Sequence, residues 1–139
     1  MIVLDTSVLS LAFRRRKTGE GDPAQAVLLR QMVADDWPLA VPGIVLQELL
    51  SGVRSDAEFR KLERCLRGFP RLLAGEAHHL HAARIVNACR RRGIVCSAVD
   101  ALIAALTIDS GGELFSNDTD FGPMASFCGL KLFSPPERV

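Results

Sequence analysis

The sequence predicts an α/β protein in which helices cover both faces of a central parallel sheet, as a three-layer α/β/α sandwich. Three observations lead to this prediction. Short apolar runs alternate along the chain with longer helical patterns. These runs are continuous, as is typical of strands buried on both faces. Asp5 and Asp118 follow the ends of two of them, and ligands of such sheets bind beyond the carboxyl ends of the strands.

The strands are expected where a few β-branched or other apolar residues are bounded by turn residues. The run Ile2-Val3-Leu4 ends at Asp5, and the second run is stopped by Pro42-Gly43. In chain order, the expected strands cover residues 2–4, 39–41, 113–116 and 130–133, with a brief extended piece at 94–96.

The helices are expected where apolar residues recur with helical spacing between start and stop signals. Thr6-Ser7 is expected to cap the first helix, and Pro23 suits the first turn of the second. Ser55 and Ser97 are expected to cap two later helices. In chain order, the expected helices cover residues 8–13, 23–33, 44–53, 56–66, 77–92, 98–109 and 121–127.

Length and composition favour one globular domain over residues 1–139. Hydrophobic residues make up 48% of the chain and charged residues 24%, which allows a sizeable core. We find neither an apolar run long enough to span a membrane nor a secretion signal, and therefore expect a cytoplasmic protein without membrane partners. The four cysteines show no metal-binding spacing and are expected to be free thiols.

The net charge of +1 excludes a globally basic nucleic-acid binder. Positive charge is nevertheless concentrated in two blocks, Arg14-Arg15-Arg16-Lys17 and Arg90-Arg91-Arg92. Taken alone, each block is typical of a solvated helix end. A role in steering phosphate requires independent evidence for an anionic ligand.

Three acidic residues stand in segments that are otherwise apolar. They are Asp5, Glu48 and Asp100, and no Lys or Arg lies in the same segments to neutralise them. Burial of an ionised carboxylate without a partner costs several kcal/mol. A bound divalent metal ion is the most economical partner for the set.

Each acid also has a simpler interpretation when it is considered singly. Asp5 can cap a helix, Asp100 can favour a helix N-terminus, and Glu48 can face solvent. Asp118 and Asp120 can be turn residues, although Asp118 comes directly after an expected strand. For Asp120, the roles of metal ligand, indirect support and cap stay open.

The types of oxygen donor near these acids indicate the kind of metal. Carboxylates with Ser, Thr and Asn oxygens suit a hard cation such as Mg²⁺ or Mn²⁺. The histidines His78, His79 and His81 fall in a separate helix without an acidic partner at metal-ligand spacing. We expect them to be surface or interface residues, so zinc is not expected.

Four segments together resemble the PIN-domain nucleases (PilT N-terminus), and most closely the VapC-like toxins of toxin–antitoxin pairs. The segment with Asp5-Thr6-Ser7 is similar to the family's opening strand with its first acid. Segments 42–52, 100–105 and 115–121 resemble those that carry the second, third and fourth acids, and the resemblance spans residues 1–133.

The resemblance implies a metal-dependent endoribonuclease with the α/β/α fold and Mg²⁺ or Mn²⁺ as cofactor. It implies an RNA substrate, a cognate antitoxin and a homodimer. The implied catalytic and metal-binding acids are Asp5, Glu48, Asp100 and Asp118, with Asp120 as a further or indirect ligand. Supporting oxygen donors would be Ser7, Ser116 and Asn117. The block Arg14, Arg15, Arg16 and Lys17 is compatible with RNA-backbone contact.

Two other functions compatible with the same fold stay open. One is a stand-alone RNA-processing nuclease, and the other is a non-catalytic interaction module. Two other α/β families fit less well. A haloacid-dehalogenase-type phosphatase needs an Asp where Ser7 stands, and a receiver domain needs an acidic pair where Asp5 stands alone.

Overall fold

The computed structural model describes residues 1–13 and 21–136 of the chain. In this part, strands and helices alternate as predicted. The strands are β1 (Ile2–Leu4), β2 (Leu39–Pro42), β3 (Arg71–Leu72) and β4 (Glu113–Phe115). The helices are α1 (Thr6–Phe13), α2 (Ala24–Ala34), α3 (Gly43–Leu50), α4 (Asp56–Leu66), α5 (Glu76–Arg91), α6 (Ala98–Ser110) and α7 (Phe121–Cys128).

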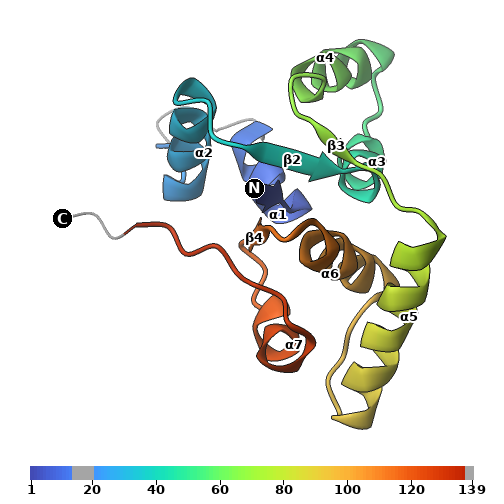
Figure 1. Ribbon diagram of the computed structural model, residues 1–139. Helices are drawn as coiled ribbons and strands as arrows, with labels where there is room; N and C mark the ends of the chain where they lie inside the picture. The colour runs from blue at the N-terminus through green and yellow to red at the C-terminus, as the bar shows by residue number, and fades with distance from the viewer. Residues whose placement is uncertain (14–20, 137–139) are drawn as a thin grey trace.

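The sheet is parallel, and its strand order is β3-β2-β1-β4. The chain crosses the sheet in one direction from β1 to β3 and returns to β4 on the other side of β1. Right-handed crossovers therefore place the helices of the outward and return connections on opposite faces. Figure 1 shows α4 on one side of β2 and β3, and α5, α6 and α7 on the other. The predicted three-layer α/β/α sandwich is confirmed.

The core is built from the continuous apolar strands and from the inner faces of the helices. Val3 and Leu4 of β1 and Leu114 of β4 are fully buried, and Phe115 is 1% exposed. On the helical side, α6 contributes Ile103 and its small neighbours, which let the helix pack closely on the sheet. In the described ranges, no helix combines the length and the apolar character needed to cross a membrane.

Three expectations about strands were wrong. The two-residue strand β3 was not predicted, because Arg71 and Leu72 carry no strand pattern of their own. Residues 130–133 form a parallel bridge at Leu132 rather than a strand. Prolines follow at 135 and 136, and these residues cannot donate to further pairing. Residues 94–96 form no strand.

Two helix boundaries also differ from the prediction. α1 begins at Thr6, so Thr6 and Ser7 are helical residues rather than caps, and Asp5 accepts the Leu9 N–H through its backbone carbonyl. α3 ends at Leu50 instead of residue 53. There the Ser51 hydroxyl donates to the Gln47 carbonyl and Ser51 takes an extended ψ, which stops the helix.

The predicted caps of α4 and α6 are confirmed. The Ser55 Oγ accepts a hydrogen bond from the Glu58 N–H, and the Ser97 Oγ accepts one from the Asp100 N–H at 3.0 Å. α6 ends at Gly111, whose φ of +72° lies in the left-handed region that glycine adopts without strain.

Candidate metal centre

The carboxyl ends of β1 and β4 meet at one edge of the sheet. Leu4 pairs with Phe115 at the end of these strands, and the Asp5 N–H donates to the Phe115 carbonyl at 3.0 Å. Asp5 therefore lies next to Ser116, the first residue after β4. Because α6 leads directly into the start of β4, the first turn of this helix, with Asp100, lies toward the same edge.

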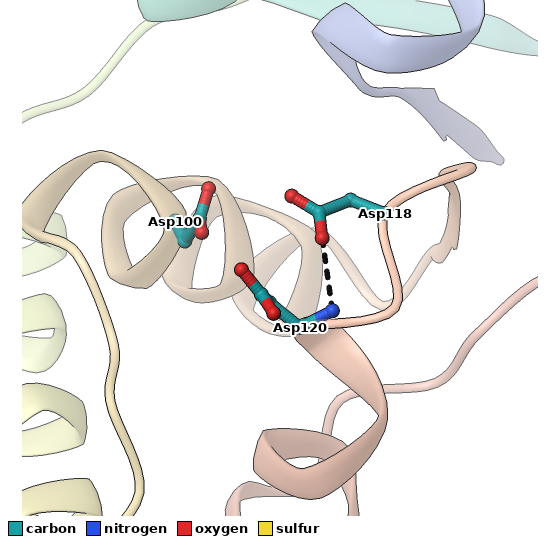
Figure 2. Close-up of side chains that lie close together, drawn as sticks. All are labelled: Asp100, Asp118 and Asp120. Atoms are coloured by element: carbon teal, nitrogen blue, oxygen red, sulfur yellow. Dashed lines mark hydrogen bonds between the residues drawn. The ribbon is translucent and has the colours of Figure 1, made fainter.

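Three aspartates come together at this edge. One carboxylate oxygen each of Asp100, Asp118 and Asp120 lies within 4.8 Å of the others. Figure 2 shows Asp100 reaching out from α6, while Asp118 and Asp120 come from the loop between β4 and α7. The Asp118 Oδ1 accepts the Asp120 N–H at 2.9 Å, which holds the loop in a tight turn. Asp118 thus stabilises the turn and also contributes an oxygen atom to the acidic cluster.

Asp120 precedes α7 but does not cap it. Its side chain makes no capping hydrogen bond, and its backbone is already helical, with φ −65° and ψ −22°. The carboxylate instead points toward Asp100 and Asp118 (Figure 2). Of the three roles left open by the sequence, the geometry favours a direct part in the acidic cluster.

Asp5 is held rigidly from two sides. It is 4% exposed, and its Oδ2 accepts hydrogen bonds from the Ser7 Oγ at 2.8 Å and the Ser116 Oγ at 2.7 Å. The Ser7 Oγ also accepts the Asn117 N–H at 2.8 Å, and the Ser116 Oγ accepts the Asp118 N–H at 3.0 Å. The two serines therefore couple the orientation of Asp5 to the path of the acidic loop.

Glu48 is an exposed residue of α3, where only Val45 is fully buried. Its expected burial in an apolar helix is therefore wrong, because α3 covers the sheet with one face only. The Thr6 Oγ1 nevertheless donates to the Glu48 Oε1 at 2.7 Å, which joins α3 to α1 beside Asp5. This role of Thr6 was not predicted from the sequence. The position of Thr6 directly after Asp5 was the feature that could have indicated it.

The side chain of Asn117 is used differently from the expectation. Its Oδ1 accepts a hydrogen bond from the Gln25 Nε2 of α2 at 3.2 Å, so this oxygen is turned toward α2. Asn117 contributes to the acidic loop through its backbone N–H, which donates to Ser7. Nothing in the sequence predicted this hydrogen bond of Gln25, since polar residues such as glutamine are common on exposed helices.

The acids influence one another electrostatically. The pKa of Asp100 is raised from 3.8 to about 6, first by burial and then by the negative charges of Asp118, Asp5 and Glu48. The hydrogen bond with Ser97 acts in the opposite direction. The pKa of Asp100 is therefore raised by three other predicted acids, which come from distant parts of the sequence.

Ion pairs with cationic side chains do not balance this concentration of negative charge within the described residues. Within residues 1–13 and 21–136, none of the five acids forms an ion pair with Lys, Arg or His. Carboxylate oxygens supported by hydroxyl groups are the donors that Mg²⁺ and Mn²⁺ prefer. The residues therefore fit a hard divalent cation.

The histidines lie away from this centre. The His81 Nδ1 is 3.0 Å from Asp109 Oδ1 near the C-terminal end of α6, and the His78 Nε2 is 3.9 Å from Asp109 Oδ2. Asp109 comes from a different helix and is brought to the histidines by the packing of α5 against α6, so the spacing of residues along α5 gave no sign of it. They are not part of any cluster in the described ranges with the spacing of metal ligands.

The predicted RNA-backbone block, Arg14 to Lys17, lies outside the residues that the structure describes. The four cysteines are free, as expected.

The PIN-domain family model matches residues 2–125, and the chain belongs to this family. Known structures with the same fold include VapBC2 from Rickettsia felis, determined bound to a DNA fragment from its promoter. This neighbour has a TM-score of 0.74 and 19% identity, with 96% of this chain and 98% of that chain covered.

Two other structural neighbours are similar to a comparable degree. FitAcB from Neisseria gonorrhoeae has a TM-score of 0.71 and 18% identity, covering 96% of this chain and 97% of that chain. VapC20 from Mycobacterium tuberculosis, a toxin that cleaves the sarcin–ricin loop, has a TM-score of 0.61 and 20% identity, covering 88% and 94%. The predicted resemblance to PIN domains of the VapC type is confirmed at the level of family and fold.

Proposed function

We propose that this PIN domain is a Mg²⁺- or Mn²⁺-dependent endoribonuclease and the toxin of a toxin–antitoxin pair. The observation that carries the proposal is the cluster of Asp100, Asp118 and Asp120 beside Asp5, with no cationic side chain among the described residues to neutralise it. VapC20, which has this fold, is an RNA-cleaving toxin, and the VapBC2 and FitAcB structures support an antitoxin partner.

The residues have distinct roles in this proposal. Asp100, Asp118 and Asp120 bind the metal ion, and Asp5 completes the site, held by Ser7 and Ser116. The ion, when bound, lowers the pKa of a water molecule and stabilises negative charge on the phosphate. Asp100 must give up its proton for the site to bind a cation. Glu48, fixed through one oxygen by Thr6, keeps its other oxygen to orient a water at the exposed side.

The reaction needs no nucleophilic side chain. Water attacks the phosphorus in line, the bond to the 3′-oxygen breaks, and the products are a 5′-phosphate and a 3′-hydroxyl. The attacking water gives up a proton to solvent, and the departing 3′-oxygen takes one up to become the 3′-hydroxyl. No atom of the protein becomes covalently attached to the RNA.

The same proposal includes a homodimer in the cytoplasm. Leu80 on α5 is 56% exposed and Leu73, just before this helix, is 74% exposed. An apolar hollow between α5 and α6, lined by Ala83, Val86 and Val99, adjoins this face. A second copy of the chain would cover these apolar side chains.

Cleavage assays with purified protein test the nuclease function. A tRNA pool and an rRNA fragment containing the sarcin–ricin loop are suitable substrates. We expect cleavage with MnCl₂ or MgCl₂, products with 5′-phosphate ends, and no cleavage in EDTA. Intact RNA under all conditions would favour the alternative of a non-catalytic interaction module. Cleavage without growth arrest on expression would favour a stand-alone RNA-processing nuclease.

Ser116→Ala is expected to lower the affinity for Mn²⁺ by about 10- to 100-fold, the effect typical of removing a hydrogen-bond partner of a metal ligand. The hydroxyl that fixes Asp5 is lost, while every proposed ligand stays in place. Calorimetric titration with MnCl₂ measures the change. Ser126→Ala is the matched control, because its Oγ donates to the Pro123 carbonyl within α7. Equal affinities of the two variants would show that Ser116 does not position the site.

A further inference from the structure

The C-terminal half of α5 and the residue that follows it carry a concentration of positive charge. Arg84, Arg90, Arg91 and Arg92, here called the arginine end, are all exposed. No Asp or Glu occurs in the sequence between Arg84 and Val99. In the parts of the chain that the structure describes, none of the four forms an ion pair. On α4 and directly after it, by contrast, Arg60 and Arg67 are paired with Asp56 and Glu63.

The arginine end is connected to the helix that carries Asp100 by a short segment. After α5 the chain folds back on itself, and the Ile94 N–H donates to the Cys89 carbonyl at 2.9 Å. Arg90 and Cys96 line one hollow beside this turn. α6 begins at Ala98, two residues before Asp100, and Ala98 and Val99 line another hollow with Ala83 and Val86 of α5.

A second series of contacts connects the arginine end to the acidic cluster through α7. The Arg92 guanidinium lies over the Phe127 ring, 4.2 Å from its centroid. Phe127 is in the last turn of α7, and the first turn of the same short helix follows Asp120. Figure 1 shows the end of α5 beside α7, on the side of the sheet that also holds α6. The arginine end and the acidic cluster are therefore bridged by two short elements.

Helix stabilisation explains only part of this arrangement. Arg90 and Arg91 lie in the last turn of α5, where cations interact favourably with the helix dipole. Arg92 is engaged with Phe127 and donates to the Ala88 carbonyl at 3.5 Å. Arg84 lies two turns earlier, beyond the reach of the dipole, and faces the same hollow as Arg92. The helix dipole therefore does not account for Arg84, and a bound anion is a reason for its place in the arginine end.

We propose that the arginine end binds the sugar–phosphate backbone of RNA next to the cleaved position. This inference rests on the proposed function, and it names the surface that holds the substrate. An acidic centre repels RNA until a cation is bound, so affinity must come from positive charge nearby. Contacts to phosphate position a nucleic acid without reading its sequence. The arginine end therefore contributes affinity, and base selection lies elsewhere.

The test removes three charges and keeps the stacked Arg92. Arg84→Gln, Arg90→Gln and Arg91→Gln are combined in an Asp100→Asn background, in which the RNA stays intact. Anisotropy of a fluorescein-labelled oligouridylate is measured with MnCl₂ over a range of KCl concentrations. We expect binding about 10-fold weaker or more, and a salt dependence smaller by about 2 in log–log slope, because each phosphate contact to a single strand contributes about 0.7.

The matched control removes three arginines from α4 and the residue that follows it, on the opposite side of the sheet (Figure 1). Arg60→Gln, Arg64→Gln and Arg67→Gln change the net charge equally, and their RNA affinity should stay within about 2-fold, as for charges outside the contact surface. Replacing the three α5 arginines with lysine should restore binding, since lysine also binds phosphate as a point charge. Melting curves of all variants establish that they are folded.

The outcomes separate this inference from the proposed nuclease activity. In one outcome, the wild type cleaves RNA while the α5 and α4 variants bind RNA with equal affinity. That result would overturn the proposal that the arginine end binds RNA. An acidic protein partner would then be the remaining ligand for these arginines. Weaker binding of the α5 variant alone supports the RNA surface, even if the wild type cleaves no RNA. In that case only the nuclease proposal fails.

Discussion

Asp100→Asn is expected to abolish metal-dependent RNA cleavage, with a loss of about a thousand-fold or more, as follows when several kcal/mol of charge stabilisation are removed. The same substitution is expected to stabilise the metal-free protein. The pKa of Asp100 is raised to about 6 by burial and by the neighbouring acids, so the ionised form that predominates at neutral pH is less favourable in the folded protein than in the unfolded chain. Removing this charge should add about 1–2 kcal/mol to the free energy of unfolding, after allowance for solvent screening.

Two measurements check this pair of effects. Single-turnover cleavage in MnCl₂ gives the loss of activity, and thermal unfolding in EDTA gives the change in stability. Asp109→Asn is the matched control, since it removes a carboxylate from the same helix at the end that contacts His81. We expect the control to cleave RNA like the wild type. An Asp100→Asn variant that is both active and less stable would show that Asp100 is only a helix-start residue.

Mn²⁺ is expected to stabilise the wild type strongly, because the cation offsets the repulsion among the acids. At one hundred times the dissociation constant, binding should add about 2.7 kcal/mol to the free energy of unfolding. The Asp100→Asn variant should gain much less. Melting temperatures with MnCl₂ and with EDTA provide the comparison. An equal rise in both proteins would place the Mn²⁺ site elsewhere.

The contribution of Asp100 to the stability of the folded protein depends on pH in a definite direction. Because the pKa of Asp100 is higher in the folded protein than its usual 3.8, the folded state binds more protons between these values. In EDTA, the contribution of Asp100 to stability is therefore fully present below pH 4 and is lost as the pH rises toward 6. The difference between wild type and Asp100→Asn isolates this contribution. Mn²⁺ should bind more tightly as the pH rises through this range, because it needs the carboxylate.

The elements of the fold were largely predictable because their signals are local. Continuous apolar runs specify buried strands, and Ser55 and Ser97 cap the helices that follow them. The failures occurred where an element depends on its neighbours. β3 consists of two residues that pair with β2, and residues 130–133 pair with β4 only around Leu132. Neither outcome follows from the segment's own pattern.

The candidate site was predictable at the level of its acids. Asp5 and Asp118 follow the ends of strands that proved to be neighbours, and parallel strands bring such residues to one edge. The sequence also pointed to a hard metal ion, since the donors near these acids are oxygens. It did not decide among metal ligand, indirect support and cap for Asp120, nor between burial and exposure for Glu48.

Tertiary structure decides where the side chains of Asp120 and Glu48 lie. Asp120 joins the cluster because the turn at Asp118 aims it at the first turn of α6, a helix built from a different part of the chain. Glu48 is tied to Thr6 because α3 packs beside α1. The sequence alone determined which elements form and which acids lie at their ends, through short-range periodicity and capping. Only the packing of distant elements decided which oxygen atoms meet, because this depends on relative positions that no local pattern encodes.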